Sequence, residues 1–328
     1  MVSIKDIAAA CRVSTMTVSR ALNDSAEISK TTKERILAMC EKMGYRPNAA
    51  ARNLVLNKTD MIGLVIPDIA NQYYAYMSKG VSSYLEKRGY GLVLCSSDRN
   101  VSNEQRYIDF LTQRRVDGII LIPIRYKVED YSNLTNMLPF VQVDNYVLNL
   151  NASYIGMDNY IGGRKIITHM LNQGYKRIGV ILSNEHSTAS NERLKGYRDV
   201  HSESSMAIDE DILIRSNATF EDGYRLAEIL INKKVDAIFA INDTVALGVI
   251  KYCYNRGIRI PQDIGVAGYD DIEQAEMFPV PLTTVHQPKI SLGETAAAVL
   301  LDEIINDNHK KQKVILKPEL VIRKSCGE

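Results

Sequence analysis

A set of polar and aromatic residues has the chemistry needed to bind a small polar molecule. Most of its members follow short apolar runs of the sequence. Carboxylates accept pairs of hydrogen bonds from hydroxyl groups, and aromatic rings cover the apolar faces of sugars. The set favours a polyol or sugar ligand, and its members are Tyr73, Tyr74, Asp144, Arg193, Asn242 and Asp270.

Loop Asp and Asn side chains have a second common use, because they cap helices. Asn71, Asp158 and Asp243 each stand where a helix is expected to begin. For these three positions, capping and ligand binding remain open alternatives at the level of sequence.

The sequence lacks the motifs of common catalytic sites. It contains no Walker-type phosphate loop, no Gly-x-Gly-x-x-Gly after an apolar run and no Gly-x-Ser-x-Gly turn. Asp270 and Asp271 are adjacent carboxylates, but neighbours on a turn usually point apart, so ligand binding and capping explain them better than acid–base catalysis. The histidines are too scattered for a metal site. We therefore expect that the protein is not an enzyme and that it binds no metal and no cofactor.

A second chemical pattern lies near the N-terminus, where residues 15–22 predict a short helix. Hydroxyl and amide side chains reach phosphates and base edges, and Arg can bind guanine through two hydrogen bonds. A helix that merely faces solvent more often carries Glu and Lys. The pattern favours a nucleic-acid-binding helix over an unrelated helical head, with contacts from Thr15, Met16, Thr17, Ser19, Arg20 and Asn23.

Three short helices are expected around this pattern. Ser3 is a good N-cap for the first and Ser14 for the second, and the third is expected to begin near Thr31, with Glu34 completing a capping box. Only residues 12–14 separate the first two helices, which is the spacing of a helix-turn-helix motif.

Three stretches of this region resemble the lactose/galactose-repressor (LacI/GalR) family: residues 3–8 (SIKDIA), 13–23 (VSTMTVSRALN) and 44–48 (GYRPN). The resemblance covers essentially the whole chain. It implies a ligand-responsive transcription regulator, most often a repressor. It also implies further DNA contacts from Ser3, Tyr45, Asn48, Ala51 and Leu54.

The segment after Pro47 predicts a short helix over residues 49–56, which is too short to be stable alone in water. Taken alone, the segment is also compatible with a plain linker. The resemblance implies a hinge helix that forms when two copies pair in the minor groove, where Leu54 opens a central base step. A marginal helix suits a switch, because a small bias orders or melts it.

The rest of the chain alternates apolar runs with helical patterns. Strands buried on both faces read as continuous apolar runs, so these runs predict parallel sheets covered by helices. The runs are residues 62–66, 91–94, 118–122, 140–143, 178–182, 237–241 and 264–268.

A faint internal repeat predicts two similar α/β lobes rather than one sheet. Residues 114–120 (RRVDGII) match residues 233–239 (KKVDAIF). Ligands bind beyond the carboxyl ends of parallel strands, so the cleft between two lobes is the expected site. The resemblance implies the same architecture, that of periplasmic sugar-binding proteins, in which the first lobe recovers the last helix, near residues 290–306.

The resemblance also bears on the ligand. Arg193, Asp270 and Gln287 lie at positions where the family binds its effector. The family often has an aromatic residue at the position of Ala218, and its absence argues against a flat, tightly stacked ligand. Some members respond to a phosphorylated carrier protein, and nothing in the sequence selects or excludes that partner.

Charge and composition agree with this division. Residues 1–60 carry ten Lys and Arg against six acids, whereas the remainder carries 30 against 33. A basic head on a mildly acidic body suggests a polyanion partner for the head alone, although chance segregation of surface charge is the alternative. No apolar run is long enough to span a membrane, and no signal peptide is recognisable. The five scattered cysteines fit a reducing cytoplasm.

The expected fold is an N-terminal all-α helix-turn-helix domain plus an α/β two-lobed, periplasmic-binding-protein-like domain with parallel sheets. The expected boundaries are 1–47 for the helix-turn-helix domain, 48–60 for the hinge helix and linker, and 61–328 for the effector-binding and dimerisation domain. The expected partners are a pseudo-palindromic double-stranded DNA operator, a sugar-like effector and a second copy of the chain. A transport-type sugar-binding protein and an α/β enzyme with a DNA-binding head are the rival interpretations.

Overall fold

The computed structural model describes residues 2–22, 27–45, 58–184, 186–306 and 310–327. Its contacts divide the chain into two units, Met1–Thr59 and Asp60–Glu328. The finer boundary expected near residue 47 lies outside the described residues, so the three-part division remains a prediction.

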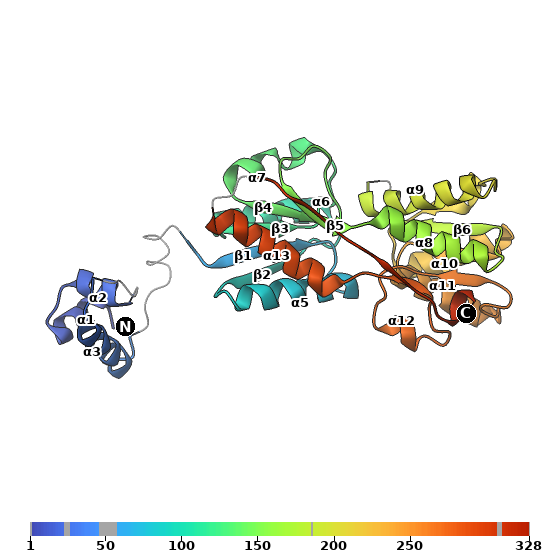
Figure 1. Ribbon diagram of the computed structural model, residues 1–328. Helices are drawn as coiled ribbons and strands as arrows, with labels where there is room; N and C mark the ends of the chain where they lie inside the picture. Colours follow the sequence, from blue (N-terminus) through green and yellow to red (C-terminus); the bar gives the residue numbers. More distant parts are fainter. Residues whose placement is uncertain (1, 23–26, 46–57, 185, 307–309, 328) are drawn as a thin grey trace. The chain divides into compact units, whose positions relative to one another are not determined.

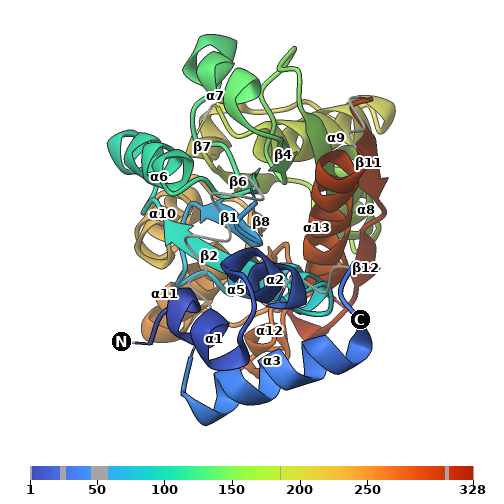
Figure 2. The ribbon, with the colours of Figure 1, turned by 90° about the vertical axis from the view of Figure 1, so that its left-hand side faces the viewer.

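The N-terminal unit contains three helices, α1 (Ile4–Cys11), α2 (Thr15–Leu22) and α3 (Lys30–Lys42), which Figure 2 shows packed together. They enclose a small core, and the fully buried Ile7, Val18 and Ile36 contribute one side chain from each helix. Helices this short are marginal alone, so their stability comes from this packing and from their caps.

Local hydrogen bonds explain where these helices begin. Asp6 accepts hydrogen bonds from the backbone N–H and the hydroxyl of Ser3, both at 2.8 Å, and Ser14 accepts one from the N–H of Thr17 at 3.1 Å. The predicted capping box of Thr31 and Glu34 is wrong. The N-cap of α3 is Ser29, because its backbone is still extended and its hydroxyl accepts a hydrogen bond from the N–H of Thr32.

The second unit contains two parallel sheets, each the centre of one lobe. The first lobe has a six-stranded sheet in the order β11-β5-β4-β3-β1-β2. Figure 1 shows α5 and α13 side by side on this sheet, and the apolar side chains of α6 and α7 pack against the sheet in a separate core. The bounds are β1 Met61–Ile66, α5 Gln72–Glu86, β2 Gly91–Ser96, α6 Val101–Gln113, β3 Gly118–Leu121, η1 Val128–Asp130, α7 Ser132–Met137, β4 Phe140–Val143, β5 Ser153–Met157, α13 Lys289–Ile305 and β11 Lys313–Leu316.

The second lobe has a four-stranded sheet in the order β7-β6-β8-β9 and a separate antiparallel pair, β10 with β12. Helix α8 packs against α9, and α10 packs against α11. The bounds are α8 Asn159–Asn172, β6 Ile178–Leu182, α9 Thr188–Glu203, η2 Glu210–Ile212, β7 Leu213–Arg215, α10 Phe220–Asn232, β8 Ala237–Ala240, α11 Asp243–Arg256, β9 Gly265–Ala267, α12 Gln274–Met277, β10 Thr284–His286, β12 Glu319–Val321 and η3 Lys324–Cys326.

The chain crosses between the lobes three times. The crossings follow β5, β10 and β11, and they run through residues 158, 287–288 and 317–318. The middle crossing returns α13 to the first lobe, as expected from the resemblance.

The internal repeat corresponds to equivalent turns in the two lobes. Helices α6 and α10 each end just before it, and Arg115 and Lys234 both adopt a left-handed backbone. The carboxylate of Asp117 accepts the N–H of Asp60 before β1, and the carboxylate of Asp236 accepts two N–H groups before β6. Each repeat therefore ties a helix–strand turn to the start of the neighbouring strand.

The seven apolar runs are confirmed as β1, β2, β3, β4, β6, β8 and β9. The sequence did not reveal β5, β7, β10, β11 or β12. Most of these strands lie at a sheet edge or in the two-stranded pair, where a partly exposed strand needs no continuous apolar run.

Close contact between α5 and α13 generates a stability prediction. A methyl group at Gly80 would overlap the carbonyl oxygen of Ile290, and that backbone atom has no side-chain freedom to move away. Gly80→Ala should therefore lower the free energy of unfolding by about 1–3 kcal/mol, as overpacking does. Urea unfolding followed by circular dichroism measures this change.

Ser82→Ala is the matched control, because Ser82 lies on the same helix and is exposed. Its effect should stay within about 0.5 kcal/mol. Equal effects of the two substitutions would contradict the close approach of the helices.

Candidate ligand-binding cleft and nucleic-acid interface

A cavity of about 120 Å³ lies between the two lobes. Its walls come from the loops after strands of both sheets and from the first turns of the helices that follow. Six of the seven predicted ligand-binding residues line it: Tyr73, Tyr74, Asp144, Arg193, Asn242 and Asp270. The parallel strands bring these residues together, because the carboxyl ends of both sheets meet at the cleft.

Arg193 is the buried cation of the cavity, with only 6% of its surface exposed. Its Nε donates to Asn159 at 2.9 Å, its Nη1 donates to the carbonyl of Ile241 at 2.7 Å, and its guanidinium lies 3.5 Å from the centre of the Tyr269 ring. Among the described residues no hydrogen bond occupies Nη2. The protein therefore fixes this cation and leaves one nitrogen for a ligand.

Two buried carboxylates face the same cavity. The hydroxyl of Tyr73 donates to Oδ1 of Asp144 at 3.0 Å, and the amide of Gln287 donates to Oδ1 of Asp270 at 2.6 Å. Within the described chain, Oδ2 of each aspartate has no hydrogen bond. One oxygen of each carboxylate thus orients the group, and the other is available to ligand hydroxyls.

Both aspartates also have a left-handed backbone, with φ values of 63° for Asp144 and 110° for Asp270. Such conformations cost free energy in residues other than glycine and persist where the surrounding structure enforces them. These two backbone conformations therefore do not contribute to the stability of the fold.

Gln287 does not line the cavity. It is fully buried and contacts Asp270 instead. The resemblance implied that Gln287 contacts a ligand directly. In the structure Gln287 instead lies behind Asp270 and orients the carboxylate of that residue.

The three capping alternatives now separate. Asn71 and Asp158 are N-caps, of α5 and α8, and Asn71 also lines the cavity. Asp243 is not a cap, because Asn242 caps α11 by accepting the N–H of Val245 at 2.8 Å. Asn242 therefore combines capping with a place in the cavity wall.

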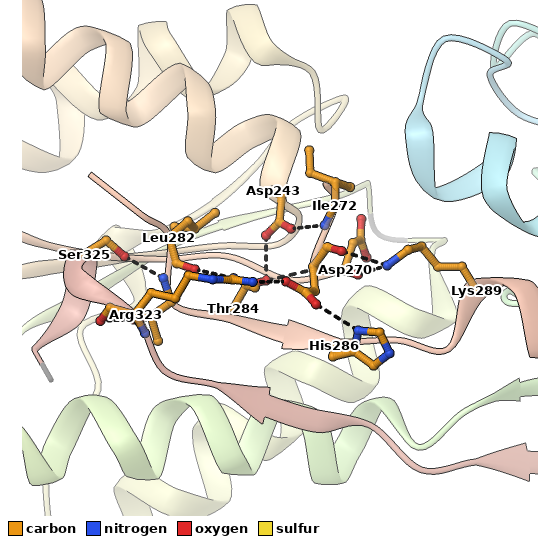
Figure 3. A network of polar contacts seen from close by, with 11 residues as sticks. Asp243, Asp270, Ile272, Leu282, Thr284, His286, Lys289, Arg323 and Ser325 are labelled. Carbon is orange, nitrogen blue, oxygen red and sulfur yellow. Dashed lines mark hydrogen bonds and ion pairs between the residues drawn. The ribbon is translucent and has the colours of Figure 1, made fainter. Parts of the chain in front are cut away.

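Asp243 instead belongs to a buried polar network behind the cavity, drawn in Figure 3. It accepts hydrogen bonds from the hydroxyl of Thr284 at 2.7 Å and from the N–H of Ile272 at 2.9 Å. Lys289, the first residue of α13, donates to the carbonyl oxygens of Asp270 and Asp271 at 2.6 and 2.8 Å. The network fastens the loop that carries Asp270 to the crossing between the lobes.

Several cavity residues were missed at the level of sequence, notably Arg99, Asn145, His186, Ser187 and Ser190. Asn145 directly follows Asp144 at the end of β4, and this placement is the one signal that marks it. Its side-chain oxygen accepts hydrogen bonds from Ser187, Thr188 and Ala189 at the start of α9 in the other lobe. These bonds join the two lobes beside the cavity.

A ring pair provides another contact between the lobes. Tyr126 of the first lobe stacks on His186 of the second, with ring centres 3.5 Å apart. The loop of Tyr126 is fixed by buried Glu104, which accepts hydrogen bonds from the N–H of Ile124 at 2.9 Å and from Arg125 at 2.8 Å. His186 lines the cavity, so the stack lies at its edge.

Burial changes the acidity of the two cavity carboxylates. It raises the pKa of Asp270 to about 7, although the charges of Arg193 and Lys289 oppose the change. Burial also raises the pKa of Asp144, against the effects of Arg193, of the hydrogen bond from Tyr73 and of Arg99. The cavity wall therefore carries less negative charge near neutral pH than two ordinary aspartates would give.

The predicted nucleic-acid contacts on α2 lie on its outer face where the structure describes them. Met16 has 62% of its surface exposed, and Thr15 and Arg20 are also exposed, whereas Thr17 and Ser19 are half-buried. Arg20 forms an ion pair with Glu27 at 2.9 Å. Such an exposed pair is worth about 0–1 kcal/mol and leaves Arg20 available to a partner.

Other predicted contacts have structural partners or lie outside the described residues. Ser3 is engaged with Asp6, and the half-buried Tyr45 packs on the core of the N-terminal unit and donates its N–H to Cys40. The predictions for Asn23, Asn48, Ala51 and Leu54, and for the hinge helix over 49–56, fall outside the described residues.

No group of three potential metal ligands occurs within the described ranges. None of the helices in those ranges is both long and apolar enough to cross a membrane.

The raised pKa of Asp270 predicts a pH dependence of stability. An ordinary Asp loses its proton near pH 3.8, whereas folded Asp270 keeps it to about pH 7, so the folded state holds an extra proton in this window. The free energy of unfolding then falls as the pH rises through the window. Asp270→Asn removes this loss, so the variant should gain stability relative to the wild type between about pH 5 and about pH 8, measured by urea unfolding.

Asp271→Asn is the matched control with the opposite sign. Burial raises the pKa of Asp271, but hydrogen bonds from His286 and Arg323 outweigh it and hold the pKa at about 2. The ionised carboxylate of Asp271 stabilises the fold at about pH 5 and at about pH 8. The Asp271→Asn variant should therefore be less stable than the wild type at both of these pH values. A pH-independent effect of Asp270→Asn would show that Asp270 titrates normally.

Comparison with known proteins identifies the family. Residues 3–48 match the lacI family of bacterial regulatory proteins, and residues 167–326 match a periplasmic-binding-protein-like domain. The HTH-type transcriptional repressor PurR of Vibrio campbellii is 32% identical over 327 residues, which cover 98% of each chain.

Solved structures agree. A LacI family transcriptional regulator from Enterococcus faecium with bound ribose is 26% identical, with a TM-score of 0.76 over 81% of this chain and 98% of that one. The lac repressor dimer bound to operator and the anti-inducer ONPF has a TM-score of 0.87 at 23% identity, covering 100% of this chain and 99% of that one, and it shares the fold.

These matches confirm the predicted family, the fold class and the expectation that the protein is not an enzyme, because the homologues are transcriptional repressors. The two rival interpretations are thereby overturned. The chain belongs to the LacI family of bacterial regulatory proteins and is a DNA-binding transcriptional repressor with an effector-binding domain.

Proposed function

We propose that this repressor binds a pseudo-palindromic operator as a homodimer in the cytoplasm. Its operator affinity changes when a polyol the size of one sugar ring occupies the cavity between the lobes. The observation that carries the proposal is the meeting, in one cavity, of six of the residues predicted to bind a polar ligand.

The proposed DNA contacts divide by chemistry. Thr15, Met16 and Arg20 are exposed on α2 and read base edges, whereas the hydroxyls of Thr17 and Ser19 position the helix on phosphates. Thr17 shares a hydrogen bond with Ser14 at 2.9 Å, which suits a positioning role. The remaining proposed contacts are Ser3, Asn23, Tyr45, Asn48, Ala51 and Leu54.

The cavity chemistry supports a hydroxyl-rich effector. Asp144 and Asp270 each offer a free oxygen to hydroxyl donors, and Nη2 of Arg193 offers a donor to a ring or hydroxyl oxygen. Tyr74 adds an aromatic wall. A cavity of about 150 Å³ holds a benzene ring, so the observed volume of about 120 Å³ favours one ring over two. The ribose in the Enterococcus faecium regulator has this size.

The proposed coupling uses the crossings between the lobes. An effector that pulls on Asp270 acts on Gln287 and Lys289, which belong to the middle crossing and to the start of α13. The hinge helix proposed for residues 49–56 would be ordered in one effector state and melted in the other. Effector and operator then influence each other's affinity reciprocally.

Two physical arguments support the remaining parts of the proposal. A helix-turn-helix unit reads a half-site, so two copies related by two-fold symmetry match a pseudo-palindrome. All five cysteines are free and buried, which suits the reducing cytoplasm. No observation favours a phosphorylated carrier protein as a further partner.

The effector hypothesis is tested with one variant. Asp270→Asn should abolish the effect of any sugar on operator affinity, because the uncharged amide no longer accepts paired hydroxyl donors. A panel of pentoses and hexoses, with a fluorescent operator fragment and an anisotropy readout, measures the response of wild type and variant.

Asp109→Asn is the control, since it removes an exposed carboxylate on α6, outside the cavity. It should leave the response intact. A normal dose-response in Asp270→Asn would refute the role of this residue in the cavity, and a wild type without sequence-specific operator binding in any effector state would refute the proposed function.

Arg20 provides the test of base reading. Arg20→Ala should weaken specific operator binding by about 1–3 kcal/mol and relax the preference at one base pair, because a bidentate contact to guanine is lost. Binding to operator and to random DNA is compared at fixed salt. Equal losses on both would show that Arg20 touches only phosphate.

A further inference from the structure

We propose that the effector carries a negatively charged group, a carboxylate on a sugar acid, and that Arg99 binds this group at one side of the cavity. This inference rests on the proposed function, because it names the chemical class of the ligand in the same cavity. Neither the family match nor the neutral ribose of the Enterococcus faecium regulator implies it.

Arg99 is held in the cavity wall by its backbone. Its N–H donates to the carbonyl oxygen of Pro67 at 2.9 Å, and its φ of 56° is left-handed. The loop is further fixed by Asn100, the N-cap of α6, which accepts the N–H of Asn103 at 3.1 Å. The side chain therefore starts from a defined place, and it is half-buried.

The guanidinium of Arg99 has no hydrogen bond or ion pair with any residue in the described part of the chain. The other cavity cation differs, because two of the nitrogens of Arg193 are committed to Asn159 and Ile241. Arg99 lies near Asp144 and Tyr74, since its charge opposes the rise that burial causes in the pKa of both groups. A planar guanidinium with free N–H groups matches a carboxylate through two parallel hydrogen bonds.

The charge balance of the cavity favours an anion. The cavity wall contains two arginines, Arg99 and Arg193, and two aspartates, Asp144 and Asp270. Arg193 is fixed and compensates the aspartates, and burial raises the pKa of both, to about 7 for Asp270. Near neutral pH the ionised carboxylates therefore do not fully offset the two arginines.

Three helix N-termini add to this positive character. The N-caps of α5, α9 and α11 are Asn71, Ser187 and Asn242, and all three line the cavity. The N-terminus of a helix carries a partial positive charge, which stabilises nearby anions. These termini come from both lobes, so a ligand anion would interact with both.

Two anionic groups match a guanidinium, a carboxylate and a phosphate. A sugar acid is little larger than the neutral sugar, because a carboxylate replaces a hydroxymethyl group. A sugar phosphate adds a tetrahedral group with three terminal oxygens. The carboxylate is the smaller addition and is the group proposed, and the phosphate becomes one arm of the test.

The experiment uses matched pairs of probes that differ only in the charged group. Glucuronate is compared with glucose, galacturonate with galactose, and ribose 5-phosphate with ribose, by isothermal titration calorimetry on the full chain near neutral pH. At least one sugar acid should bind about tenfold or more tightly than its neutral partner, which corresponds to about 1.4 kcal/mol. In Arg99→Gln the ratio of the two dissociation constants should fall to near one.

Arg106→Gln is the matched control, because it removes the same charge from an exposed position on α6 outside the cavity. It should keep the wild-type preference for the acid. If only ribose 5-phosphate binds more tightly than its neutral partner, the result would support an anionic ligand but would overturn the proposal that the charged group is a carboxylate.

Three outcomes overturn the inference altogether: neutral sugars that bind as tightly as their acids, an Arg99→Gln variant that loses both ligands equally, or no binding by any of the six probes. Operator binding separates this failure from failure of the proposed function. A neutral sugar that shifts operator affinity and binds as tightly as its acid supports the proposed function and overturns the inference. An acid that binds through Arg99 without affecting the operator leaves the inference standing and overturns the proposed control.

Discussion

Arg193 and the two carboxylates that face it, Asp144 and Asp270, form the interaction on which the cleft depends. A buried charge is tolerated only when other charges and hydrogen bonds compensate it. Arg193 satisfies this condition with an amide, a carbonyl oxygen and the ring of Tyr269. Because these partners come from different strands and helices, the position of the cation fixes the relative placement of several loops.

The two carboxylates have fewer hydrogen bonds from the protein than Arg193 has, and this difference leaves oxygen atoms available to a ligand. Each uses one oxygen for an orienting contact and keeps the other available. Their left-handed backbones and the burial that raises the pKa of Asp270 both lower the stability of the folded protein. A ligand that completes the hydrogen bonds recovers part of this cost, so binding stabilises the lobes in the arrangement that holds the ligand.

The polar network behind the cavity connects the loop that carries Asp270 to the first lobe. Lys289 begins α13, which packs on α5, yet its amine binds the backbone of the loop that carries Asp270. In the proposed coupling, a change at Asp270 therefore acts on a crossing between the lobes and on a helix of the opposite lobe. Asn145 and Tyr126 add contacts across the cleft that depend on the arrangement of the lobes.

The sequence by itself determined the elements whose signals are local. Ser3 and Ser14 revealed two helix starts, continuous apolar runs revealed seven strands, and the paired turns at Asp117 and Asp236 revealed two lobes. Local signals did not show which of the neighbours Asn242 and Asp243 caps α11. They also did not reveal β11, because a strand at the edge of a sheet needs no continuous apolar run. The sequence also revealed six cavity residues. Most follow recognisable strand ends, and parallel strands end on the same side of a sheet, whereas Arg193 was indicated by the family resemblance.

Tertiary structure alone decided which side chain touches the cavity and which lies behind it. Gln287, Lys289 and Asp243 carry amide, cationic and carboxylate groups, as several wall residues do, but contacts between residues far apart in sequence place them in a second layer. Arg99 joined the wall for the same reason, since no local pattern sets it apart from a surface loop residue, and Asn145 is marked only by its position directly after Asp144. Whether a polar group faces a ligand or another side chain depends on the packing of both lobes, and no local pattern encodes that packing.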